Sequence, residues 1–352
     1  TTAASIPKQR FDNFKIFSVN VENSEQLNVL SELEKHDYDF WESPVLGDVA
    51  DLVIPPDKES YFMRLVNLHE MNASVKVANI QDLMDLQQPI IAPKSGYEWE
   101  LYHSLDEIYA FLDELLEQFP TFLTPFTVGY SYENREIRGV KLSRQEGNKA
   151  ILIDATIHAR EWISTPAATW LLKELLKSEK PEVADMSSNI DWYIIPVNRA
   201  WRKSRTPHSH LCYGVDLNRN FDFHWNTVGA SDDPCSDIYA GPSPFSDKES
   251  IAYKDFFEAN KERFMVHFAF HSPGQYILSP FGYTYNYPDN HDELMKIGNA
   301  AAKAISQRNG TEYLVGTTAE VLRPNSGTVR DWMKGVHNIS ATYTIEMRYV
   351  RQ

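Results

Sequence analysis

The sequence predicts an α/β protein: a doubly wound mixed sheet with helices on both faces, preceded by a small α+β open sandwich. Two observations predict it. Residues 11 to about 90 suggest strand, helix, two strands, helix and strand, an order typical of an open sandwich. After about residue 97, apolar runs typical of buried strands alternate with amphipathic helical stretches. The 352 residues are enough for a small and a large domain.

The first unit begins with residues 14–21, where apolar and polar residues alternate as in a half-buried strand. We expect Ser24 to cap a helix in which Leu27, Leu30 and Leu33 recur at helical spacing. The remaining elements are expected as strands near 38–41, 50–54 and 73–77 and a second helix over 61–68. We place the first domain, with a connecting segment, at 1–94 and the second domain at 95–352.

The connecting segment, 88–96, contains two prolines and a glycine, which mark an exposed, non-helical stretch where proteolysis concentrates. Lys94 is the single basic residue of this segment. We therefore expect a lysine-directed endoprotease to cut there. The alternative is that Lys94 is an ordinary linker lysine.

In the second unit, Ser104 and Glu107 have the spacing of a capping box, which opens an amphipathic helix ending near Pro120. Strands and helices then alternate, as is typical of a doubly wound sheet. The strands are expected over 150–156, 191–197, 263–271 and 341–347, and the helices over 165–177, 247–260 and 292–308.

The composition narrows the class of protein. With 42% hydrophobic and 12% aromatic residues the chain is globular, and its net charge of −15 argues against nucleic-acid or anionic-membrane partners. No apolar run could span a membrane, and the first residues lack the apolar core of a signal peptide, so we expect any such segment to have been removed already. Asn-x-Ser/Thr triplets at Asn72, Asn309 and Asn338 favour secretion.

A candidate metal site lies where the chain leaves the strand 150–156. His158 and Glu161 stand in the turn before the helix opened by Thr165. Because a catalytic zinc takes three nitrogen, oxygen or sulfur ligands and keeps one position open, these side chains could supply two of them. Alone, a His-x-x-Glu pair is more often a solvated ion pair.

The third ligand should lie at another strand end, because sites in doubly wound sheets form at the carboxyl ends of strands. His271 fits this position, whereas His267 lies inside the strand, where a histidine is more often a satisfied core residue; we therefore reject His267 as a ligand. A base is also needed to take the proton of the attacking water. Glu346, near the end of its strand, suits that role, and the alternative is a structural ion pair with Arg348.

The segment from Ile157 to Ser164 resembles the zinc-binding signature of the funnelin metallocarboxypeptidases, the pancreatic carboxypeptidase A/B type. Further matches follow in the family's order over most of the chain, and the first domain resembles the activation segment of procarboxypeptidases. The resemblance implies a secreted, extracellular zymogen, with the digestive lumen as one candidate location. It would bind one Zn2+ per chain and hydrolyse C-terminal peptide bonds. Its partners would be peptide and protein C-termini, an activating endoprotease and proteinaceous carboxypeptidase inhibitors.

The resemblance also implies a role for each matching residue. His158, Glu161 and His271 would hold the zinc, Glu346 would be the general base, and Arg202 would polarise the scissile carbonyl and stabilise the oxyanion. Asn218 and Arg219 would bind the terminal carboxylate of the peptide, Arg160 would belong to an outer subsite, and Ser272 would contact the substrate. The resemblance also implies a disulfide between Cys212 and Cys235; the alternative is two reduced thiols.

Specificity is expected to depend on Arg330, which precedes the Asp331-Trp332 pair that fixes the register with the family. The residue at this place lies at the base of the pocket for the departing side chain and is apolar in type A enzymes and aspartate in type B. A buried cation is costly without a partner, so the pocket should favour C-terminal Glu, or Asp, as in carboxypeptidase O-like enzymes. Alternatively, Arg330 swings out or pairs with an acid such as Asp331, which leaves a type A preference for aromatic or aliphatic termini.

The chain departs from the family's pattern in several places. Arg323 stands where the family has a mobile substrate-capping tyrosine, and Pro273 replaces another tyrosine. The usual loop after Val197 is missing, and the sequence ends at Gln352, so either the chain is truncated or those segments are absent from the printed sequence. The rival interpretation is a peptide-binding pseudo-carboxypeptidase, although such a protein would normally have lost a zinc ligand or the base.

The first domain is acidic, with 15 Asp and Glu against 8 Lys and Arg through Lys94. This charge suits a cover over an arginine-rich cleft. We therefore expect a latent enzyme that is activated by a cut near Lys94.

Overall fold

The computed structural model describes residues 10–35, 38–42, 44–86, 96–196, 202–208 and 212–348. The chain divides into two compact units. The first comprises the chain up to Leu101 together with Cys235–Asp237, and the second comprises the rest. Among the helices of the described ranges, none is long and apolar enough to cross a membrane.

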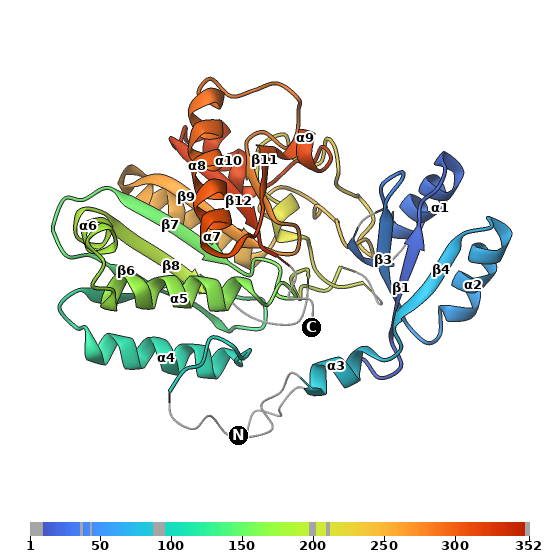
Figure 1. The fold of residues 1–352 in the computed structure, drawn as a ribbon, viewed down its shortest axis with the longest axis horizontal. Helices are drawn as coiled ribbons and strands as arrows, with labels where there is room; N and C mark the ends of the chain where they lie inside the picture. The colour runs from blue at the N-terminus through green and yellow to red at the C-terminus, as the bar shows by residue number, and fades with distance from the viewer. Residues whose placement is uncertain are drawn as a thin grey trace. The chain divides into compact units, whose positions relative to one another are not determined.

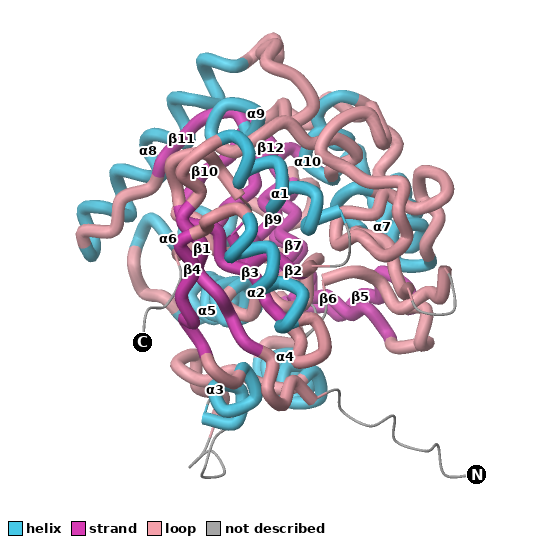
Figure 2. Tube along the Cα trace, turned by 90° about the vertical axis from the view of Figure 1, so that its right-hand side faces the viewer, coloured by secondary structure: helices cyan, strands magenta, loops and turns pink. Residues whose placement is uncertain are grey.

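The first unit has the expected order of strands and helices. Its antiparallel sheet, in the order β2-β3-β1-β4, is formed by β1 (Lys15–Asn20), β2 (Asp39–Glu42), β3 (Val49–Ile54) and β4 (Asn72–Val77). Helices α1 (Ser24–Lys35) and α2 (Glu59–Leu68) lie on one face of this sheet (Figure 2). Phe17, Leu52 and Phe62 are buried in the core between the sheet and these helices.

Two local details of the first unit differ from the sequence expectation. Asn23 caps α1 in place of Ser24, because the Asn23 side-chain oxygen accepts the Gln26 N–H at 3.0 Å. A third helix, α3 (Ile80–Leu86), was not expected. Its Ile80 packs with Ile16 and Val53 in a second, smaller core cluster.

The second unit is a mixed sheet of eight strands with helices on both faces, which confirms the expected fold class (Figure 1). The strand order is β11-β10-β12-β9-β7-β8-β6-β5, in which β8, β7, β9 and β12 are parallel to one another. The strands are β5 (Leu123–Tyr130), β6 (Glu136–Leu142), β7 (Ala150–Ala155), β8 (Asp191–Pro196), β9 (Phe264–His271), β10 (Tyr276–Ser279), β11 (Leu314–Thr317) and β12 (Ala341–Glu346).

The helices of this unit are α4 (Leu105–Gln118), α5 (Ser164–Lys177), α6 (Pro181–Asn189), α7 (Lys248–Asn260), α8 (His291–Asn309), α9 (Thr318–Val321) and α10 (Val329–Gly335). Side chains alternate between the two faces along β12. Thr342 and Thr344 bond to Arg330 of α10, whereas Tyr343 donates its hydroxyl to the carbonyl of Leu294 on α8. Helices α10 and α8 therefore cover opposite faces, and the parallel strands between them are buried.

Candidate active site

The turn that follows β7 carries two of the expected site residues. Thr156, directly after the strand, has φ +61°, an uncommon value for a β-branched residue. Its hydroxyl lies 3.0 Å from that of Thr165, at the start of α5. The Glu161 N–H then donates to the carbonyl of His158 at 3.1 Å, which closes a tight turn. The turn therefore places His158 and Glu161 on the same side of the backbone.

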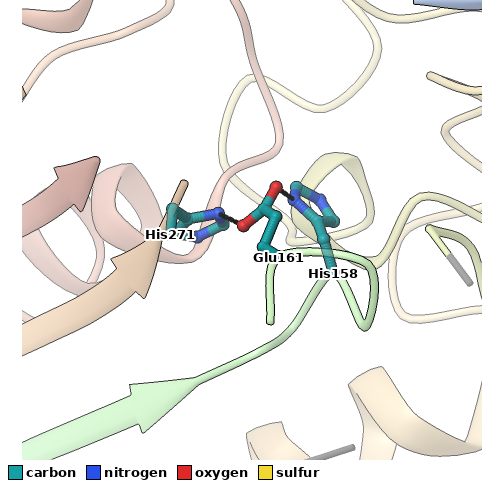
Figure 3. A group of neighbouring side chains, drawn as sticks. All are labelled: His158, Glu161 and His271. Atoms are coloured by element: carbon teal, nitrogen blue, oxygen red, sulfur yellow. Dashed lines mark hydrogen bonds and ion pairs between the residues drawn. The ribbon is translucent and has the colours of Figure 1, made fainter. Parts of the chain in front are cut away.

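His271, the last residue of β9, meets these two side chains. The Glu161 carboxylate lies between the two imidazoles, with Oε1 2.7 Å from His158 Nδ1 and Oε2 2.8 Å from His271 Nδ1 (Figure 3). The possible ligand atoms of all three lie within 4.8 Å of one another. Both histidines are buried and Glu161 is 9% exposed, so the pair is not a solvated surface ion pair.

Asp216, which was given no role from the sequence, bonds to both His158 and Arg202. Its Oδ1 lies 2.9 Å from His158 Nε2, and its Oδ2 accepts a 2.6 Å bond from Arg202 Nη2. A histidine that binds metal usually gives its other N–H to a carboxylate, so a partner for His158 could have been sought in the sequence. Asp216 was a candidate because it lies two residues before Asn218, which was already expected in the site. Arg202, His158 and Arg219 hold the pKa of Asp216 well below its usual range, although burial acts in the opposite direction.

The donor set and its charges fit a zinc ion. Two imidazole nitrogens and a carboxylate oxygen are the ligands that zinc accepts, and a buried carboxylate needs positive charge beside it. Burial would raise the pKa of Glu161, but His158 and His271 hold it well below its ordinary value. Burial would lower the pKa of His271, but Glu161 raises it to about 9. Among the described residues, His271 Nε2 has no hydrogen-bond partner.

Glu346 lies beside this group. It is the last residue of β12 and the register partner of His271 on β9. Burial, with the Glu161 charge, raises the pKa of Glu346 to about 7, although His271, Arg202 and Arg330 oppose the shift. The charged groups that shift the pKa of Glu346 are thus all residues that the sequence analysis placed in the active site.

The expected carboxylate-binding residues stand close to Asp216. The Asn218 N–H donates to Asp216 Oδ1 at 2.9 Å. Arg219 donates from Nε to the Gly229 carbonyl and from Nη1 to the Asn218 carbonyl, both at 2.8 Å. Burial, with the charges of Arg202, Arg323 and Arg330, lowers the pKa of Arg219 to about 10, although Asp216 opposes the shift. The guanidinium groups of Arg202, Arg323 and Arg330, from separate segments, are therefore close enough to act on Arg219.

Arg330 is buried and does not swing out to solvent. Its Nε donates to Asp331 Oδ1 at 3.1 Å and its Nη1 to Thr344 Oγ1 at 3.0 Å. Nη2 is 3.0 Å from Asp331 Oδ1 but, within the described part of the chain, has no hydrogen-bond partner. Asp331 is shared, because its Oδ2 accepts the Gly282 and Tyr283 N–H groups at 2.7 and 3.2 Å. Arg330 therefore forms an ion pair with Asp331, while its Nη2 keeps an unused hydrogen-bond donor among the described residues.

The remaining expected residues have different outcomes. The Ser272 N–H donates to Glu161 Oε2 at 3.3 Å, and Arg160 lies between His158 and Glu161 in the sequence. His267 is buried inside β9 and contacts Asp154. The two cysteines of the chain, Cys212 and Cys235, are both disulfide-bonded, so the expected bridge is confirmed and the reduced alternative is excluded. Lys94 lies outside the described residues.

Comparison with known families agrees with this geometry. A family model described as zinc carboxypeptidase matches residues 108–352, and one described as carboxypeptidase activation peptide matches residues 17–87. The chain belongs to the zinc carboxypeptidase family. It is a zinc-dependent exopeptidase that carries an activation segment, in the proenzyme form.

Individual relatives of this zinc carboxypeptidase cover most of the chain. Zinc carboxypeptidase A 1 of Drosophila melanogaster is 33% identical over 373 residues, which cover 99% of this chain and 86% of that protein. Carboxypeptidase O of Homo sapiens is 37% identical over 269 residues, or 72% of each chain. The crystal structure of carboxypeptidase A from Helicoverpa armigera superposes with a TM-score of 0.85 at 28% identity, covering 97% of this chain and 90% of that one.

Proposed function

We propose that this zinc carboxypeptidase is a secreted zymogen that removes C-terminal glutamate, or aspartate, once its activation segment is cut at Lys94. The observation that supports the specificity is the buried guanidinium of Arg330, whose Nη2 has no hydrogen-bond partner among the described residues. A ligand carboxylate would give Nη2 an acceptor, whereas an apolar side chain would leave this donor unsatisfied.

In this proposal His158, Glu161 and His271 hold the metal. A zinc ion there would lower the pKa of a water molecule and polarise the scissile carbonyl. Glu346 takes the proton of the water that attacks the carbonyl carbon. It then delivers a proton to the departing nitrogen as the C–N bond breaks. Arg202, held by Asp216, stabilises the negative charge on the carbonyl oxygen.

The peptide's terminal carboxylate is assigned to Asn218 and Arg219. Arg219 is oriented by its two bonds to backbone carbonyls, and its Nη2 takes no part in them. An arginine fixed in this way can bind a carboxylate without losing much side-chain freedom. Arg160 is assigned to an outer subsite and Ser272 to the substrate contact beside Glu161.

Secretion is supported by the disulfide, because such bonds persist in oxidising compartments. The domain boundary at 94/95 and the cut at Lys94 are supported by the composition of the linker. Proteinaceous inhibitors as partners stay a prediction.

One observation favours the type A alternative, namely the contact between Arg330 and Asp331. The deciding experiment gives the cleaved, zinc-loaded chain blocked dipeptides that end in Glu, Asp, Phe, Leu or Lys. We expect the highest kcat/KM for Glu. A higher value for Phe or Leu would reject the acidic preference but leave the carboxypeptidase assignment, whereas zinc binding without any turnover would support the pseudo-enzyme. Trimming of a peptide library, followed by mass spectrometry, extends the ranking to longer substrates.

A further inference from the structure

A second polar cluster joins the same two strands that lead to the metal-binding histidines. It joins Asp154 of β7, His267 of β9 and Tyr253 of α7. His267 Nε2 contacts Asp154 Oδ2, and the Tyr253 hydroxyl donates to the same oxygen at 2.8 Å. The same hydroxyl is 3.5 Å from His267 Nε2. Asp154 and His267 are buried, with exposures of 4% and 1%.

The position of this cluster in the sequence is regular. Asp154 precedes His158 by four residues, and His267 precedes His271 by four. Strands β7 and β9 are parallel neighbours. In the register of these strands Asp154 pairs with Ala269 and His267 with Leu152, so the contact between Asp154 and His267 runs diagonally from one strand to the other. The cluster therefore ties the two strands together four residues before each metal-binding histidine.

The turn after Asp154 needs such an anchor. Thr156 holds a positive φ that costs free energy for a β-branched residue, and such a conformation persists only where the surroundings enforce it. On one side the turn is bonded to Thr165 of α5. On the other side Asp154 is held by Tyr253 and His267.

We propose that Tyr253, His267 and Asp154 form a positioning network that fixes the separation of the two zinc histidines. The inference rests on the proposed metal-binding roles of His158 and His271. None of the three residues touches the metal or the substrate; they act through the ends of β7 and β9. Loosening the network would let the imidazoles spread and would weaken the metal site without removing a ligand.

Tyr253→Phe is the direct test, because the ring can keep its edge-on contact with Phe221 while the hydroxyl is lost. Tyr109→Phe is the matched control, because Tyr109, like Tyr253, is only partly buried. It removes a hydroxyl that donates to the Glu136 carbonyl at 2.7 Å and accepts from the Arg138 N–H at 3.2 Å, at β6, which β8 separates from β7. We measure zinc dissociation constants on the full chain by competition with a chromophoric chelator, together with the visible absorption of the Co2+-substituted protein.

We expect Tyr253→Phe to raise the zinc dissociation constant by about tenfold, the lower end of what residues that orient metal ligands contribute. It should also change the cobalt bands, and Tyr109→Phe should do neither. His267→Leu is the second variant, should Tyr253→Phe fold poorly, and His267→Gln should restore affinity because it keeps an N–H donor for Asp154.

Dissociation constants within about twofold of wild type for both Tyr253→Phe and His267→Leu would overturn the network. His158→Gln separates this outcome from a failure of the metal site. If that variant still binds zinc like wild type, the proposed ligand set is wrong.

Discussion

Glu346 and His271 are register partners at the ends of the parallel strands β12 and β9. Two residues far apart in the sequence thus bring a carboxylate beside the imidazole proposed to bind the metal. Because β12 is held by β9 on one side and β10 on the other, Glu346 is fixed in position before any substrate arrives.

Replacing this carboxylate tests the general-base role. Glu346→Gln keeps the shape of the side chain but cannot accept a proton. We expect kcat to fall by roughly 10²–10⁴-fold, the usual contribution of a positioned base. Zinc content, measured by atomic emission, should stay at one ion per chain, because Glu346 is not assigned as a ligand. Full activity in this variant would remove Glu346 from the reaction.

The same variant has a predictable effect on stability. Burial raises the pKa of Glu346 from 4.5 to about 7, so the folded chain keeps a proton there that the unfolded chain has released. The contribution of this bound proton to the free energy of unfolding is fully present below the unfolded pKa of 4.5. It is lost as the pH rises through the folded pKa of about 7. At pH 8, zinc-free Glu346→Gln should melt roughly 2–4 °C above wild type, whereas near pH 4 the two should coincide. A lower melting temperature at pH 8 would contradict this sign.

Asp216 is expected to support the metal and the oxyanion residue together, because it bonds both His158 and Arg202. Asp216→Asn should weaken zinc binding by about 10–100-fold and also lower kcat. Asp191→Asn is a matched control: Asp191 is buried and paired with Lys141 at 3.0 Å, away from the metal-binding turn. The control should lower the melting temperature and leave the zinc dissociation constant unchanged. Equal zinc affinities in both variants would show that Asp216 is only structural.

The sequence predicts the parallel part of the large sheet well, because strands buried on both faces appear as continuous apolar runs. It did not reveal β5, β6, β10 and β11, since these strands mix polar and apolar residues or are only four residues long. Helix α10 is only seven residues long, too short to show a helical repeat of apolar residues. Its Asp331-Trp332 pair was therefore used to fix the register with the family, but no helix was predicted there.

The site follows a similar division. His158, His271 and Glu346 could be placed because they lie at or just after strand ends, where sites in such sheets form, and the resemblance to the carboxypeptidases added Glu161 and the roles of all four. Asp216 and Thr344 could not, because their importance lies in which side chain they meet and not in their own local pattern. The cluster around Asp154 was missed for the same reason: His267 appears as an isolated core histidine until Asp154 and Tyr253 are seen beside it.

Latency is expected to depend on Lys94. Lys94→Gln should resist a lysine-directed endoprotease and stay inactive, whereas wild type should gain activity in step with the appearance of a new N-terminus at Ser95. Lys76→Gln is the control, because this lysine lies within β4 of the first unit and its loss should not prevent activation. Equal activity before and after cutting would show that the first domain does not inhibit.

Arg330 decides between the acidic and the apolar pocket. In Arg330→Ile, Asp331 keeps its bonds from the Gly282 and Tyr283 N–H groups, so the loop around it should hold its conformation. We expect kcat/KM for a terminal Glu to fall by roughly 30-fold or more, since losing one partner of a buried charge pair costs about 2–5 kcal/mol. The value for terminal Phe or Leu should rise, so that the ranking reverses. Arg330→Lys, which keeps the charge but not the planar fork, should retain the preference for Glu at reduced kcat/KM. An unchanged ranking in Arg330→Ile would mean that Asp331 already neutralises the guanidinium and that other residues select the departing side chain.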